Sequence, residues 1–96
     1  MKNYLLAYSP DSIKDIEEAV DYYNKLQSGL GNKFIADIEK TLASIKRNPF
    51  HASVKYDNIR CAGLKKFPFA IHYSIEEEIK RTIIVAVFNT WKEPFW

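Results

Sequence analysis

The hydrophobic positions of this chain follow a helical period in its first half and a strand period in its second half. The run 4–8 is short and apolar, which predicts a strand. Ser9 suits the N-cap of a helix and Pro10 its first turn, so we predict that a helix begins here. Its apolar positions recur every three or four residues; they are Ile13, Ile16, Val20 and Tyr23, flanked by Ala19, Tyr22 and Leu26. Segment 28–31 holds two glycines and is expected to end the helix, because glycine readily adopts the C-cap conformation.

A second helix is predicted directly after these glycines. Its apolar face consists of Phe34, Ile35, Ile38, Leu42 and Ile45. Asn48-Pro49 ends it, because the residue before a proline avoids the helical region. The short connection between the two helices predicts an antiparallel helix hairpin.

The remainder of the chain has strand patterns. Segment 54–64 is polar and interrupted, which predicts either one irregular strand or a strand with a bulge near Gly63. Segment 67–75 alternates apolar with small or polar residues, so one of its sides should face the core. After the charged turn 76–78, segment 83–88 is apolar on both sides, as is typical of a central strand.

These elements predict a single α+β domain over residues 1–96 with the order β-α-α-β-β-β. The last three strands should form an antiparallel meander, and the first strand should pair beside the last one. The helix hairpin is expected to cover one face of the sheet. We expect the other face to carry Arg60, Lys65 or Lys66 and some of the aromatic side chains.

Composition and charge indicate a globular protein without a membrane span, whose second half is basic. The hydrophobic content of 47% and charged content of 27% are typical of a globular domain. Residues 1–45 hold five lysines and seven acids, whereas residues 46–96 hold nine basic and five acidic residues. A basic half of this kind attracts anions, although a solvated surface is the alternative. Cys61 is the single cysteine, and no apolar run approaches the ~20 residues of a membrane span, so we expect a cytoplasmic protein.

Cationic residues are the best candidates for chemistry. We expect neither a metal nor a cofactor, because His51, His72 and Cys61 do not match a metal-ligand spacing. A Cys61–His72 pair on neighbouring strands is a minor alternative. Arg60 suits bidentate phosphate binding, or else a structural pair with an acid such as Asp57 or Glu93. The positive electrostatic potential around Arg60 would be strengthened by Lys55, Lys65, Lys66 and Lys92. Tyr73, Trp91 and Trp96 suit base stacking, although core packing is favoured for Tyr73.

The sequence resembles the RelE/ParE-type toxins of bacterial toxin–antitoxin systems. The resemblance covers nearly the whole chain and rests on short motifs in a fixed order. They are Tyr8-Ser9-Pro10, Tyr22-Tyr23, Asn48-Pro49, Ile59-Arg60, the run Lys66-Phe67-Pro68-Phe69-Ala70-Ile71-His72-Tyr73, and the closing Lys92-Glu93-Pro94-Phe95-Trp96. The resemblance implies a helix hairpin on an antiparallel sheet and a cognate antitoxin as partner. RelE-like members cut messenger RNA on the ribosome, whereas ParE-like members poison DNA gyrase.

This chain departs from the ribonuclease pattern. Ala70 stands where ribonuclease members tend to carry an arginine, and Asn89 and Lys92 stand where many relatives carry a histidine and an arginine. Trp96 replaces a tyrosine that some nucleases place near the end. The resemblance therefore implies a ParE-like toxin that binds a target such as gyrase. A metal-independent endoribonuclease acting on ribosome-bound mRNA and a degenerate, non-toxic interaction protein are the alternatives, so the question of enzymatic activity stays open.

The resemblance also assigns candidate site residues. The positions carried over as functional or catalytic are Arg60, Lys66 and Lys92, with Trp91 and Trp96 as contacts. Antitoxin binding is expected beside the first helix, at Tyr22, Tyr23 and Leu26, and at a free edge of the sheet that can accept an added strand.

Overall fold

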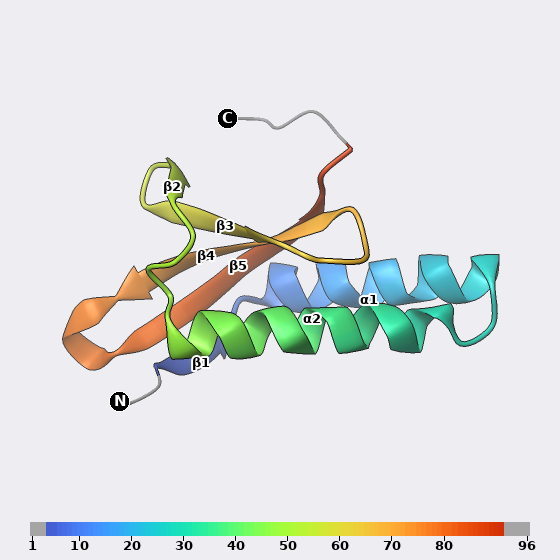
Figure 1. Cartoon of the computed structure of the whole chain (residues 1–96), viewed down its shortest axis with the longest axis horizontal. Coiled ribbons are helices and arrows are strands. Elements are labelled where there is room, and N and C mark those ends of the chain that lie inside the picture. Colours follow the sequence, from blue (N-terminus) through green and yellow to red (C-terminus); the bar gives the residue numbers. More distant parts are fainter. Residues whose placement is uncertain (1–3, 92–96) are drawn as a thin grey trace.

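A helix hairpin packs on one face of a five-stranded sheet in the computed structural model, which describes residues 4–91 (Figure 1). The sheet order is β1-β5-β4-β3-β2. The elements are β1 (Leu5–Tyr8), α1 (Pro10–Leu26), α2 (Leu30–Arg47), β2 (Val54–Tyr56), β3 (Ile59–Gly63), β4 (Phe69–Glu76), the short 3-10 helix η1 (Glu77–Ile79) and β5 (Arg81–Asn89). The predicted α+β class is confirmed, with one strand more than the sequence pattern indicates.

The start of α1 is defined by a serine that bonds to both layers of the fold. The Ser9 hydroxyl accepts a hydrogen bond from the Ser12 N–H (3.1 Å) and donates one to the Val85 carbonyl on β5 (2.9 Å). The predicted N-cap is therefore confirmed, and it also fixes α1 to the sheet. Gly29 ends the connection with φ of 86°, which a side chain would disfavour. The helix α2 begins at Leu30, earlier than its apolar face indicates.

The two ends of the chain pair within the sheet. β1 pairs with β5, as predicted for the first and last strands, and Ala7 lies opposite Ile83. These two strands run parallel, so the sheet is mixed and not wholly antiparallel as expected from the sequence. β5 is thus covered by β1 on one side and β4 on the other. This position explains its largely apolar sequence: Ile84, Ala86 and Val87 are buried, and so is the polar residue Thr82.

Two details of the strands differ from the sequence prediction. Segment 54–64 forms two strands, β2 and β3, because Asp57 adopts φ of 47° and reverses the chain between them. No irregularity is found at Gly63. The ladder instead shifts where His72 pairs with Ala86 and Tyr73 with Ile84, which leaves Val85 as an extra residue. This bulge lets Ile84 and Val87, three positions apart, both face the helices.

The core between the helices and the sheet is largely aromatic. Tyr23 lies with its ring centroid 5.4 Å from that of Phe34 and 4.8 Å from that of Phe67, and Phe34 lies 5.0 Å from Phe69. Tyr73 is 1% exposed, and its hydroxyl donates to a backbone carbonyl 2.7 Å away in the segment after α2. The expectation that Tyr73 is a packing residue is confirmed.

Candidate functional site

Arg60 lies on the side of the sheet that the helices cover. It pairs directly with Tyr73, a core residue, and paired residues of antiparallel strands share a face. Its Nη1 donates to the carbonyls of Ala52 (2.7 Å) and Phe50 (3.4 Å), and its guanidinium carbon lies 5.1 Å from the Phe50 ring centroid. The expectation that Arg60 lies on the open face is therefore wrong. Its guanidinium ties the 50–52 segment to the start of β3.

Lys66 lies beyond the other end of β3, in a loop that a buried carboxylate holds. Asp37 on α2 is 4% exposed and accepts backbone N–H groups from Lys65 (3.3 Å), Lys66 (2.8 Å) and Phe67 (3.2 Å). Three convergent N–H groups form an anion-binding concavity, and Asp37 fills it. The Lys65 and Lys66 side chains are left exposed to solvent. Sequence reasoning missed Asp37, although an acid beside the apolar positions of α2 is a detectable signal.

The open face of the sheet carries a neutral aromatic cluster. The Tyr56 hydroxyl lies 3.0 Å from His72 Nδ1, and the rings of His72 and Phe88 have centroids 4.8 Å apart. Burial lowers the pKa of His72 and raises the pKa of its cross-strand neighbour, the Cys61 thiol. Burial thus favours the neutral form of both groups, which disfavours a thiolate–imidazolium pair.

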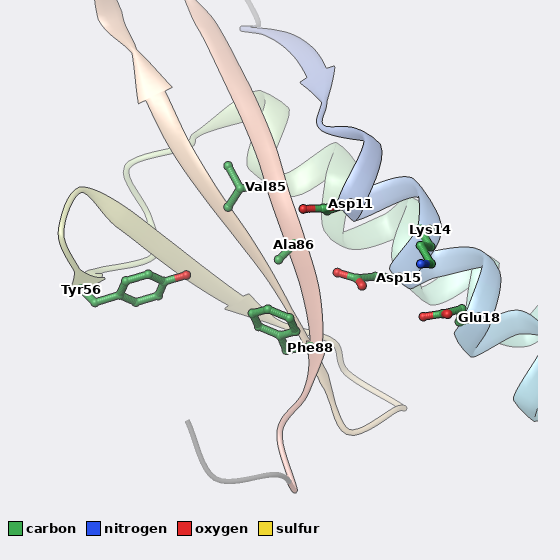
Figure 2. A pocket seen from close by; sticks show the side chains of 8 residues that line it. All are labelled: Asp11, Lys14, Asp15, Glu18, Tyr56, Val85, Ala86 and Phe88. Carbon is green, nitrogen blue, oxygen red and sulfur yellow. The ribbon is translucent and has the colours of Figure 1, made fainter. Parts of the chain in front are cut away.

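A hollow of about 400 Å³ lies between the start of α1 and β5 (Figure 2). Its lining residues are Asp11, Lys14, Asp15, Glu18, Tyr56, Val85, Ala86 and Phe88. Asp15 Oδ2 accepts the Val87 N–H (3.0 Å) and thereby caps the edge of β5 where β1 has ended. Burial, together with the charges of Glu18 and Asp11, raises the pKa of the Asp15 carboxyl. Because carboxylates line one side of this hollow and aromatic rings the other, the hollow suits a basic or apolar side chain of a ligand better than an anion.

The residues expected to bind a partner divide into exposed and buried ones. Tyr22 and Leu26 are 57% and 60% exposed at the end of α1, whereas Tyr23 is 8% exposed and packs in the aromatic core. Trp91 is 84% exposed. Lys92 and Trp96 lie outside the described residues. The structure therefore brings Tyr22 and Leu26 together on one surface and keeps Tyr23 beneath it.

Neither a metal-binding group nor a membrane-spanning helix is found in residues 4–91. These residues contain no group of three or more His, Cys, Asp or Glu side chains placed to hold a metal ion. Neither α1 nor α2 combines the length and apolar character that crossing a membrane requires.

Known proteins resemble this chain in sequence pattern and in fold. The family model of the ParE toxin of type II toxin–antitoxin systems (parDE) matches residues 6–92. The chromosomal ParDE system from P. aeruginosa has a TM-score of 0.78 at 16% identity, over 90% of this chain and 95% of that one. The RelBE2 toxin–antitoxin complex from Mycobacterium tuberculosis gives 0.66 at 13% identity, over 93% of each chain. The E. coli RelBE complex gives 0.61 at 16% identity, over 95% of this chain and 99% of that one.

No protein of curated function matches the sequence. The structural matches are below 25% identity and establish the fold, whereas the family model spans nearly the whole chain. The resemblance to RelE/ParE toxins drawn from the short motifs is confirmed, on the ParE side of that superfamily. The chain belongs to the ParE toxin family of type II toxin–antitoxin systems.

Proposed function

We propose that this toxin inhibits growth by binding DNA gyrase and that a cognate antitoxin neutralises it. The observation that carries the proposal is the match of residues 6–92 to the ParE family. The resemblance described above associates ParE-like members with gyrase and RelE-like members with messenger RNA.

The placement of the candidate catalytic residues supports a binding function. Arg60 lies near the start of β3, whereas Lys66 lies in the loop beyond its end, and the strand residues from Arg60 to Gly63 alone span about 10 Å. The Arg60 guanidinium is directed at backbone carbonyls, and burial favours neutral His72. Phosphodiester cleavage requires a cation and a proton-transfer group within reach of the same phosphate. Within residues 4–91, Arg60, Lys66 and His72 do not converge in this way.

The proposal is tested with purified gyrase, a relaxed plasmid and ATP. We expect the toxin to abolish supercoiling in a dose-dependent manner, and the co-purified antitoxin to restore it. The control replaces the toxin with a heat-denatured sample at the same concentration. Full supercoiling at excess toxin, from a preparation that still arrests growth when expressed, would reject gyrase as the target.

Primer extension on messenger RNA distinguishes the ribonuclease alternative. The chain is expressed briefly without antitoxin, beside the variants Arg60→Ala and Lys66→Ala. Growth arrest without new cuts is the result that the gyrase proposal expects. New cuts at codon boundaries that both variants abolish would favour a ribosome-dependent endoribonuclease. The second variant is needed because Arg60→Ala also removes hydrogen bonds within the fold. Harmless expression would favour a degenerate, non-toxic member.

The antitoxin is expected to cover Tyr22 and Leu26. Two large apolar side chains that are more than half exposed, four residues apart on one helix, suit an apolar segment of a protein partner. The RelBE complexes that share this fold contain an antitoxin chain. We expect the double variant Tyr22→Asp/Leu26→Asp to lose antitoxin in a pull-down. Ile13→Asp is the matched control, because Ile13 is an exposed apolar residue near the other end of α1.

A further inference from the structure

Three basic residues form a row along the exposed side of α2. Lys33, Lys40 and Arg47 are spaced by seven residues, which is nearly two helical turns, so they follow one another about 10.5 Å apart on one side of the helix. All three are exposed, and so are the small residues Ala36 and Ala43 on the same side. We name the three cations the basic row.

The β3–β4 loop adds two more cations beside this row. Asp37 follows Lys33 by four residues and precedes Lys40 by three, so its side chain emerges next to both. Because Asp37 binds the backbone N–H groups of Lys65 and Lys66, the loop is held over α2 at this point (Figure 1). Both loop lysine side chains are exposed. The basic row and these two lysines together form what we call the basic surface.

None of the five cations of the basic surface forms an ion pair in the described part of the chain. The ion pair found between residues 4 and 91 joins Arg81 to Glu76, away from α2. Asp37 is buried and bonded to the loop, and its negative charge offsets one of the five positive charges. Glu39, the other acid of α2, lies one residue before Lys40 and therefore points about 100° away from it. Five cationic side chains are therefore exposed to solvent, and the surface keeps a net positive charge after Asp37 is counted.

We propose that the basic surface binds the phosphodiester backbone of a nucleic acid. Protein–DNA interfaces are rich in positive charge and need few apolar contacts. The core of a protein–protein interface instead favours aromatic residues and is depleted of lysine. The basic surface has lysine, arginine and alanine, whereas the large exposed apolar side chains Tyr22 and Leu26 lie on α1. This inference does not rest on the gyrase proposal, because its test contains no gyrase.

Fluorescence anisotropy with a labelled 20-base-pair DNA duplex and a labelled 20-nucleotide RNA tests the inference. Five phosphate contacts predict a slope of about −4.5 for log K against log salt on the duplex and about −3.5 on the single strand. A rise from 50 to 200 mM salt should therefore weaken duplex binding about 500-fold. The triple variant Lys33→Gln/Lys40→Gln/Arg47→Gln keeps two contacts and should weaken only about 12-fold over the same range. The ratio of the dissociation constants for the two probes at one salt concentration shows which form of nucleic acid is preferred.

A charge-matched control distinguishes binding by the basic surface from nonspecific electrostatic attraction between the whole protein and nucleic acid. It is the triple variant Lys14→Gln/Lys25→Gln/Lys55→Gln, which loses the same charge from exposed positions elsewhere. The control should keep the wild-type slope, and circular dichroism and thermal midpoints should show that both triple variants fold. No binding by the wild-type chain, or equal slopes for the two triple variants, would overturn the inference. Binding of labelled poly-glutamate but of neither nucleic acid would overturn it too, and would assign the surface to an acidic protein.

Discussion

Replacing Asp37 by alanine should destabilise the fold more than removing any exposed acid of the chain. The Asp37 carboxylate on α2 accepts three backbone N–H groups from residues 65–67. Among the described residues, no other carboxylate joins this loop to α2. Hydrogen bonds to a charged group contribute about 1.5–3 kcal/mol each when well formed. One of the three is short (2.8 Å), and the other two are long (3.2 and 3.3 Å).

The magnitude follows from these lengths and from the exposure of the loop. We assign about 2 kcal/mol to the short bond and about 1 kcal/mol to each long one. Water can reach the loop at Lys65 and Lys66, which recovers about 1 kcal/mol in the variant. Asp37→Ala should thus lower the free energy of unfolding by about 3 kcal/mol. For a domain of this size the thermal midpoint should fall by roughly 12–24 °C.

Urea unfolding followed by circular dichroism measures this loss. Asp37→Asn keeps an oxygen acceptor without the charge and should cost about half as much. Glu39→Ala removes an exposed carboxylate from the same helix and should change stability by less than about 0.5 kcal/mol. A midpoint for Asp37→Ala equal to that of Glu39→Ala would refute the reasoning and would show that the loop is held by its apolar contacts.

Three further predictions concern buried polar groups and one glycine. Tyr73→Phe should lose about 1–2 kcal/mol in urea unfolding, since the buried Pro49 carbonyl loses its donor; an unchanged midpoint would contradict the bond. Gly31→Ala should lose about 1 kcal/mol, because the added Cβ would lie 2.6 Å from Asn24 Nδ2 and break the Asn24–Gly31 hydrogen bond (2.8 Å). In an Asn24→Ala background the same change should be neutral or stabilising, and equal losses in both backgrounds would argue against the clash. Burial lowers the pKa of His72 below its unfolded value of about 6.5, so the unfolded state binds the proton first as the pH falls. The free energy of unfolding should therefore decrease as the pH drops from about 6.5 towards the folded-state pKa. His72→Gln should flatten this dependence in unfolding measured from pH 7 to 5, and identical pH profiles for the two proteins would refute the assignment.

The elements of this fold could be predicted where the signal is local. The N-cap at Ser9 depends on an N–H three residues away, and helix faces repeat within two turns. The apolar character of segment 83–88 correctly predicts a strand with neighbours on both sides. The short motifs likewise indicate the toxin family, which the family model confirms.

The tertiary structure decided what depends on residues far apart in the sequence. A strand pattern predicts alternation but not which face each side chain takes, so the position of Arg60 under the helices required its pairing with Tyr73. The bulge at Val85 exists because the ladder between β4 and β5 shifts, which neither strand shows alone. Asp37 and Phe67 are 30 residues apart, and only folding brings the carboxylate to the loop. Strand register and buried hydrogen bonds are set by packing between distant segments, whereas caps and periodicity are set by neighbours along the chain.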